Sequence, residues 1–230
     1  MSKAALIVGE SGTGKSTSVS FLDPKQTFII NVQGKDLPFR GYSKNYTPIP
    51  EEGPPSEGNL LNTSDPKLIS KVVVYVSENR PEIKNIIIDD WQYVAATEFM
   101  NKAEQKGFDK FTSIGKNIWT IAYLPKLCKR DDLMLFYLTH SESAVDETTG
   151  GRYMKAKTVG KLVDNVVTLE GMFTIVLFTD VEKTKEGINY SFLTQNTGSN
   201  TAKSPMGMFE TLKVPNDLNM VRNTVYEYYN

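Results

Sequence analysis

The 230-residue sequence is poor in the residues from which proteins build disulfides and zinc sites. Its single cysteine is Cys128 and its single histidine is His140. One cysteine excludes an intramolecular disulfide and any cysteine-based zinc site, because each needs at least two thiols. We therefore expect a protein that works in a reducing interior, with Cys128 as a half-buried helix residue.

Long hydrophobic runs are also missing. Apolar runs such as residues 85–88 and 173–178 have the length of strands, whereas a membrane helix needs about 20 consecutive apolar residues. The N-terminus shows no charged segment followed by a long apolar one, so no secretory signal is visible. We expect no membrane association and a cytoplasmic location.

The sequence has no excess of either charge. The formal net charge is −1 at pH 7, whereas a dedicated duplex-DNA binder usually carries a strong basic excess. Any binding of nucleic acid must therefore come from a local basic stripe or from an assembled oligomer.

A phosphate-binding motif is present at the N-terminus. An apolar run at residues 4–8, typical of a buried strand, leads into G-x-x-x-x-G-K-[ST] at residues 9–16, and residues 16–22 have the pattern of a helix. A strand, a Gly-rich turn and a helix in this order form the context of a P-loop. The nucleotide-binding residues predicted from it are Gly9, Glu10, Ser11, Gly12, Thr13, Gly14, Lys15, Ser16 and Thr17.

The residue types of this loop suit the chemistry of phosphate binding. Glycines let successive N–H groups point at phosphate oxygens, and the helix N-terminus adds a partial positive charge. Lys15 supplies an ammonium group for the β- and γ-phosphates, and the Ser16 hydroxyl can ligate Mg²⁺.

Strands and helices alternate along the rest of the chain. We predict strands at residues 27–32, 85–88, 133–139, 152–157, 165–169, 173–181 and 189–194, and helices at residues 66–79, 91–106, 109–129, 159–163 and 217–229. Alternation predicts an α/β fold with a mainly parallel central sheet flanked by helices. A turn at residues 185–187 predicts an antiparallel hairpin at one edge. We expect one domain over residues 1–230, with a long surface insertion at about residues 33–62.

Four candidate site residues follow predicted strands. Gly9, Gln33, Asp89 and His140 each come directly after a strand, and ligands of such sheets bind at the carboxyl ends of the strands. We therefore expect them at one rim. Asp89 is the predicted metal ligand, usually acting through water.

For two residues at this rim the sequence allows more than one role. Asp90 either orients or polarises the attacking water or caps the helix that begins at Trp91, and the sequence leaves both open. A lone histidine is usually structural, but the position of His140 after the next strand favours a γ-phosphate sensor or a residue that assists catalysis. Further along, Lys155, Lys157, Lys161 and, on weaker grounds, Lys203 either act in trans on a neighbour's γ-phosphate or form a solvated basic face.

The order of these motifs resembles the RecA-like recombinase core, from residue 4 to about residue 192. IIIDD is similar to its acidic strand, LFYLTH to its strand with a polar phosphate sensor, and KLVDNVVTLEG to the approach to its following strand. More closely, a family of compact bacteriophage ATP-binding proteins, some described as minimal RecA-type single-strand annealing proteins, is similar to the segments FIINVQGKDLPFRG, RPEIKNIIIDDWQYV, FTSIGKNIW, TVGKLVDN, LEGMFTIVLFTDVE and FLTQNTGSNTAKSPMGMF.

This resemblance implies a Mg²⁺- and ATP-dependent ATPase of phage recombination in the host cytoplasm. It implies binding of single-stranded DNA, annealing or strand exchange, cooperation with a single-strand binding protein, and a homo-oligomer with ATP between subunits. RecA-type proteins activate water with a glutamate, and the matching residue here is Gln33. A glutamine positions water without accepting its proton, so either hydrolysis is slow or Asp90 is the base.

Two other functions stay open. A nucleotide-gated, DNA-associated accessory protein with little hydrolysis is consistent with Gln33. A small P-loop kinase usually closes an Arg-rich lid over its phosphates, and here the arginines are scattered along the chain, at positions 40, 80, 130, 152 and 222.

Overall fold

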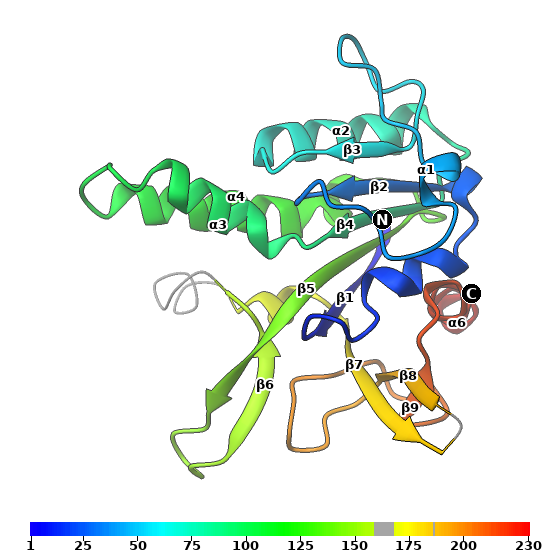
Figure 1. The fold of residues 1–230 in the computed structure, drawn as a ribbon, viewed down its shortest axis with the longest axis vertical. Helices are drawn as coiled ribbons and strands as arrows, with labels where there is room; N and C mark the ends of the chain where they lie inside the picture. The colour runs from blue at the N-terminus through cyan, green and yellow to red at the C-terminus, as the bar shows by residue number, and fades with distance from the viewer. Residues whose placement is uncertain (159–167, 186) are drawn as a thin grey trace.

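A single mixed sheet organises the fold, which we describe from a computed structural model covering residues 1–158, 168–185 and 187–230 (Figure 1). Its strands run in the order β3-β2-β4-β5-β1-β7-β8-β9, with β6 paired to β5 outside this path. The strands are β1 (Lys3–Gly9), β2 (Thr27–Asn31), β3 (Leu60–Asn62), β4 (Asn85–Asp89), β5 (Met134–Val145), β6 (Arg152–Ala156), β7 (Ile175–Thr184), β8 (Gly187–Leu193) and β9 (Lys213–Pro215). The helices are α1 (Tyr42–Asn45), α2 (Pro66–Asn79), α3 (Gln92–Asn101), α4 (Asp109–Leu127) and α6 (Leu218–Tyr229), with 3₁₀ helices η1 (Ser16–Phe21), η2 (Pro24–Gln26) and η3 (Leu169–Met172).

The direction of the strands confirms the predicted fold class. From β3 to β7 every neighbouring pair is parallel, and β8 and β9 add antiparallel pairs at one edge. Strand β1, which leads into the Gly-rich loop, lies between β5 and β7, so β5 separates it from the acidic strand β4. The carboxyl ends of β1 and β4 therefore meet His140, in the middle of β5, at one rim.

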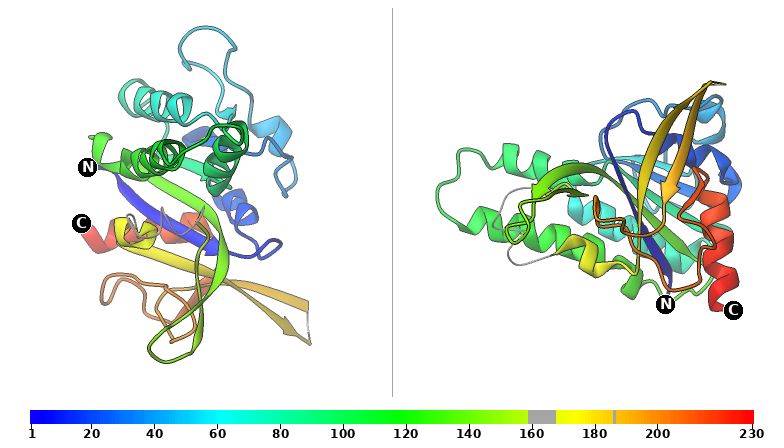
Figure 2. Two further views of the ribbon diagram at one scale, coloured as in Figure 1. Left: turned by 90° about the vertical axis from the view of Figure 1, so that its left-hand side faces the viewer. Right: turned by 90° about the horizontal axis from the view of Figure 1, so that it is seen from below.

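Helices cover both faces of the sheet (Figure 2). Successive side chains of a strand point to opposite faces, and in β1 Leu6 and Val8 pack on one side while Ala5 and Ile7 pack on the other. The first core contains apolar residues of α2, α3 and α4, and the second contains apolar residues of η1 and α6. The central strands are apolar on both faces because both faces are covered.

Helices α2 and α6 both begin with a capping aspartate. The Asp65 side chain accepts a hydrogen bond from the Lys67 N–H, and Pro66 is the first residue of α2. The Asp217 side chain accepts from the N–H groups of Asn219 and Met220 at the start of α6. These caps satisfy backbone donors that have no partner inside the helix.

The helix predicted after the Gly-rich loop is a 3₁₀ helix, η1. In it the Ser18 hydroxyl donates to the Lys15 carbonyl, and the Ser20 hydroxyl donates to the Thr17 carbonyl. Side-chain bonds three residues back compete with α-helical backbone bonds, and this serine-rich segment keeps the tighter turn. Helix α3 also ends earlier than predicted, at Asn101, before a polar stretch.

The strand prediction was wrong at two places. Strand β5 continues beyond His140 to Val145 and pairs with β6 in a projecting hairpin, whereas the predicted strand ended at residue 139 (Figure 1). Leu169 belongs to η3 instead of a strand, because the buried Glu170 side chain accepts hydrogen bonds from Ala156 and Thr201 and holds a turn there. Residues 159–163 and 165–167, predicted as a helix and most of a strand, lie outside the described residues.

The segment at residues 33–62 is partly ordered, as predicted, by packing of Leu37, Phe39 and Tyr42 against the second core. Its last three residues form β3, which we did not predict. This short strand pairs with β2 at the edge of the sheet. Strand β9 was missed for the same reason: three residues carry no periodic signal, and only pairing with a neighbour makes them strands.

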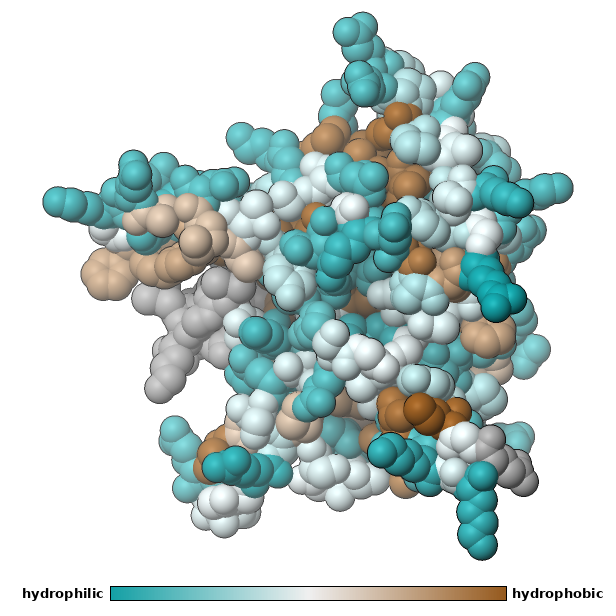
Figure 3. Space-filling model, viewed as in Figure 1, coloured by the Kyte–Doolittle hydropathy of each residue, from teal (hydrophilic) through white to brown (hydrophobic). Residues whose placement is uncertain are grey.

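The face seen in Figure 1 is hydrophilic across its middle (Figure 3). Apolar surface lies at the far end of α3 and α4, where Met100 and Phe108 are exposed, and over the β7–β8 hairpin, where Ile188 is exposed. In the described part of the chain, no helix combines the length and the apolar character that crossing a membrane requires.

Candidate functional site

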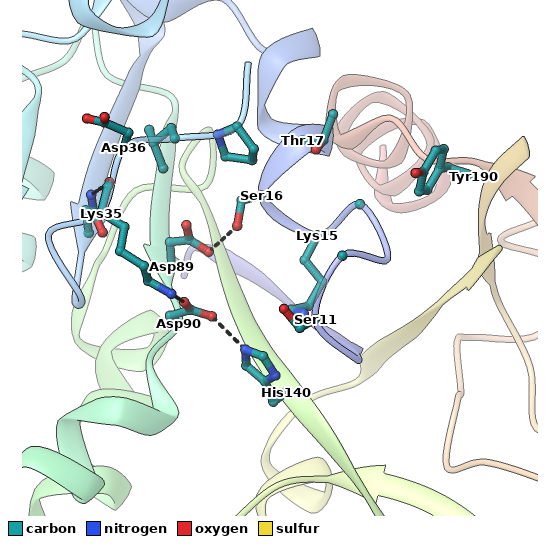
Figure 4. Close-up of a pocket in the computed structure, with 15 residues that line it drawn as sticks. Ser11, Lys15, Ser16, Thr17, Lys35, Asp36, Asp89, Asp90, His140 and Tyr190 are labelled. Carbon is teal, nitrogen blue, oxygen red and sulfur yellow. Dashed lines mark hydrogen bonds and ion pairs between the residues drawn. The ribbon is translucent and has the colours of Figure 1, made fainter. Parts of the chain in front are cut away.

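A cavity of about 360 Å³ opens at the rim where the carboxyl ends of β1 and β4 meet His140 of β5 (Figure 4). Its wall contains most of the predicted site. The lining residues are Ser11, Gly12, Gly14, Lys15, Ser16, Thr17, Asn31, Lys35, Asp36, Leu37, Pro38, Asp89, Asp90, His140 and Tyr190.

The Gly-rich loop has backbone conformations that require glycine. Gly12 and Gly14 have φ angles of 78° and 94°, in the left-handed region that side chains with a Cβ avoid. At Gly9 the constraint is space, since a Cβ there would lie 1.7 Å from Thr179 Oγ1. Hydrogen bonds of Thr13 also hold the loop, because its Oγ1 lies 2.6 Å from Thr179 Oγ1 and donates to the Glu10 carbonyl at 2.7 Å.

Lys15 is buried beneath this loop. Its Nζ donates to the carbonyl oxygens of Gly9 at 2.9 Å and Glu10 at 2.7 Å. Burial lowers the pKa of Lys15, and the charges of Asp90 and Asp89 oppose that shift. A buried ammonium group in the cavity wall, held by neutral carbonyls, suits an anionic ligand.

Ser16 and Asp89 form the predicted metal-binding pair. The Ser16 hydroxyl donates to Asp89 Oδ1 at 2.9 Å, and Asp89 is only 5% exposed. Burial and the negative charge of Asp90 together raise the pKa of Asp89 to about 6, against the opposing effect of the Ser16 hydrogen bond. A hydroxyl and a carboxylate side by side are oxygen ligands of the kind Mg²⁺ takes while keeping several waters. These residues therefore fit a phosphate-bound Mg²⁺ ion.

Asp90 faces the cavity and does not cap the following helix. Helix α3 begins at Gln92, its N-cap residue is Trp91, and no side chain caps it, so the capping alternative is wrong. Asp90 has a φ angle of 57°, the single left-handed conformation of a non-glycine residue in the described chain. Such conformations concentrate at functional sites, where the surrounding structure holds them.

The carboxylate of Asp90 connects two other side chains of the cavity. Its Oδ2 lies 2.9 Å from Lys35 Nζ, and its Oδ1 lies 3.3 Å from His140 Nε2 (Figure 4). The backbone N–H of His140 donates to Gln92 Oε1 at 3.3 Å, and the His140 imidazole packs edge to face against the Tyr93 ring. Burial and then the positive charge of Lys15 lower the pKa of His140.

No family model and no curated protein matches the sequence. In structure the chain is similar to a KaiC-like protein from the hyperthermophilic archaeon Pyrococcus horikoshii, with 12% identity and a TM-score of 0.46 over 83% of this chain and 77% of that one. It is also similar to the flagellar accessory protein FlaH from Methanocaldococcus jannaschii, with 12% identity and a TM-score of 0.46 over 88% of this chain and 82% of that one.

Six residues of the wall were not predicted as site residues from the sequence, and these are Asn31, Lys35, Asp36, Leu37, Pro38 and Tyr190. Lys35 lies two positions after Gln33, just beyond the same predicted strand, so its position was a usable signal. For Tyr190 the sequence predicted the β7–β8 hairpin but not its place over the loop, where a Cβ on Gly14 would lie 3.0 Å from the Tyr190 ring. Gln33 itself is exposed and is not part of the cavity wall.

Three of the lysines predicted to act in trans, Lys155, Lys157 and Lys203, lie outside the cavity wall. Lys155 forms an ion pair with Glu142 at 3.2 Å within the β5–β6 hairpin, and Lys157 is exposed just after that hairpin. The backbone of Lys203 bonds to Val176. Lys161 lies outside the described residues. Contact of these lysines with a neighbouring subunit remains a prediction.

Proposed function

We propose that the protein binds Mg²⁺ and ATP and hydrolyses ATP with a RecA-like core. The observation that carries this proposal is the contact between Ser16 and Asp89 beside the buried Lys15, where the loop after β1 meets the end of β4. This arrangement places an ammonium group, a hydroxyl and a carboxylate around one cavity, as a metal-bound triphosphate requires.

The residues of the loop would divide the work of binding. Its N–H groups and the Lys15 ammonium bind the phosphates, with Lys15 exchanging carbonyl partners for phosphate oxygens. Ser16 and Asp89 would hold the metal, and a Mg²⁺ ion bound there would supply positive charge to neutralise the negative charge that develops on the phosphates. The burial of Lys15 and Asp89 strengthens both interactions, because fewer water molecules screen them.

Tyr190 supports a position for the base. Its ring lines the cavity on the far side of the loop from Asp89 and Asp90 (Figure 4). With the terminal phosphate near the two carboxylates, the nucleoside extends toward this ring. Stacking of a base on an aromatic side chain contributes about 1–3 kcal/mol.

The engagement of Asp90 favours slow hydrolysis. Its two carboxylate oxygens have Lys35 and His140 as partners. A general base needs a free oxygen within reach of water. This observation supports the second candidate, a nucleotide-gated, DNA-associated accessory protein with little turnover.

For the biological process, we propose phage DNA recombination by binding and annealing, or exchanging, single-stranded DNA, in the cytoplasm of the bacterial host. The sequence resemblance supports this role, with a homo-oligomer and a single-strand binding protein as partners. The projecting β5–β6 hairpin supports contact between subunits, because it carries Lys155 away from its own cavity (Figure 1).

Phosphate release from ATP, with and without single-stranded DNA, tests this proposal on wild type and Lys15→Ala. Lys71→Ala, at an exposed position of α2, is the matched control. We expect turnover that rises with DNA in wild type and control and is lost in Lys15→Ala. Equilibrium ATP binding on the same proteins shows whether a loss of turnover reflects a loss of binding.

The outcomes separate the candidate functions. ATP binding without turnover, with or without DNA, would favour the accessory protein over the ATPase. Transfer of phosphate to a small acceptor would indicate a kinase. Elution volume with ATP and DNA tests the oligomer, and a monomer under every condition would rule out the trans-acting lysines.

A further inference from the structure

A row of three polar side chains crosses the cavity from the end of β2 to β5 (Figure 4). Lys35 and His140 contact opposite oxygens of Asp90, at 2.9 Å and 3.3 Å. All three line the same cavity as Lys15. The cavity wall therefore contains a second ammonium group, separated from Lys15 by the carboxylates of Asp89 and Asp90.

The backbone of Lys35 is held in place while its side chain extends into solvent. The Nδ2 atom of the buried Asn31 donates to the Lys35 carbonyl at 2.6 Å. Gly34, with a φ angle of 63°, makes the turn just before it. The Lys35 side chain is 61% exposed, whereas that of Asp90 is 12% exposed. The ammonium group can therefore move over the cavity from a fixed anchor.

Asp90 is the fixed member of this pair. Its carbonyl accepts from the Tyr93 N–H at 3.0 Å at the start of α3, and its left-handed backbone directs the side chain to the cavity. An exposed lysine on a well-held carboxylate is an ion pair whose cation can change partner.

A bound triphosphate changes the balance of charge in this cavity. Its terminal phosphate would bring negative charge beside Asp89 and Asp90, and close like charges repel unless a cation lies between them. Among the described residues of the wall, Lys15 and Lys35 are the lysines, and no arginine is present. Lys15 lies under the loop, so Lys35 is the cation on the Asp90 side.

We propose that Lys35 binds the terminal phosphate in cis, exchanging its Asp90 partner for a phosphate oxygen and thereby distinguishing ATP from ADP. This inference rests on the proposed function, because it requires the nucleotide to occupy this cavity. Lys35 would supply from the same chain the positive charge that an arginine finger supplies from elsewhere in other enzymes. The exchange also frees one oxygen of Asp90.

The affinities of Lys35→Ala for ADP and for a non-hydrolysable ATP analogue test the proposal. Lys35→Arg retains the positive charge, and Lys44→Ala removes an exposed lysine from the same segment as a matched control. We expect Lys35→Ala to lose about tenfold in affinity for the ATP analogue. Its affinity for ADP stays at the wild-type level, Lys35→Arg recovers most of the loss, and Lys44→Ala matches wild type.

A second variant reverses the direction of the effect. Asp90→Asn removes the competing anion, and asparagine tolerates the left-handed backbone. We expect it to bind the ATP analogue more tightly, with a larger gain when Lys35 is present than in the Lys35→Ala background. Equal weakening of ATP analogue and ADP by Lys35→Ala, or no change in either, would overturn the proposal. Failure of wild type to bind either nucleotide would instead overturn the proposed function, and this inference with it.

Discussion

The buried carboxylate of Asp89 should destabilise the protein without its ligands, and Asp89→Asn should remove this cost. Burial and the neighbouring Asp90 raise the pKa of Asp89 from an ordinary value of 3.8 to about 6. An ionised group with such a shift costs about 3 kcal/mol of folding free energy at neutral pH. Asparagine keeps the shape, and its side-chain oxygen still accepts the Ser16 hydroxyl.

The sign of the pH dependence follows from proton binding. Between the ordinary pKa of 3.8 and the folded-state value of about 6, the folded protein binds more protons at Asp89 than the unfolded chain does. Stability therefore falls as pH rises through this window, and the full cost is present above it. Asp89→Asn should be more stable than wild type by up to about 3 kcal/mol at pH of about 7.5, and close to wild type at pH of about 4.

Urea unfolding at both pH values, with a chelator and without nucleotide, measures this difference. Asp132→Asn is a control of opposite sign, because Arg130 and Lys84 hold the pKa of Asp132 well below its usual range. That stabilisation is present above the ordinary pKa and is lost as pH falls through the folded-state value, so this variant should be less stable at neutral pH. An Asp89→Asn variant less stable than wild type at pH of about 7.5, or equally stabilised at both values, would refute the reasoning.

Three further variants test other parts of the structure. Gly9→Ala should destabilise the protein by about 1–3 kcal/mol through overpacking, and Thr179→Ala should recover part of this loss in a double-mutant unfolding cycle; no recovery would show that the clash lies elsewhere. Tyr190→Ala should weaken ATP and ADP equally, by about 1–3 kcal/mol in a binding titration, and an effect on ATP alone would contradict a contact with the base. Asn117→Ala should cost about 1–3 kcal/mol of stability, because its amide donates to both Glu98 oxygens at 2.9 Å, and unchanged nucleotide affinity is expected because both residues lie outside the cavity wall.

Local patterns were sufficient for much of the fold and for the core of the site. The motif at residues 9–16 and the acidic end of β4 were predicted from residue types and spacing, and Ser16 and Asp89 do lie in contact. Helices α2 and α6 begin at Pro66 and Leu218, within one residue of their predicted starts, because helix starts depend on residues close in the chain. The alternation of strands and helices was enough to predict a mainly parallel sheet.

Contacts between distant segments decided the rest. Strand β3 exists because β2 is beside it, Tyr190 reaches the loop because β8 pairs with β7, and β5 extends past His140 because β6 pairs with it. The local sequence predicted the β7–β8 hairpin, but neither of the other two pairings nor the position of the hairpin over the Gly-rich loop.

The phosphate-binding loop was determined by the sequence itself, because a P-loop is built from consecutive residues. The role of Asp90 was decided only by the tertiary structure. The sequence left it between a helix cap and a water-orienting residue, whereas the fold directs it into the cavity between Lys35 and His140. Those partners come from segments 55 and 50 positions away along the chain, and only the packing of β2, β4 and β5 in one sheet brings them to the same carboxylate.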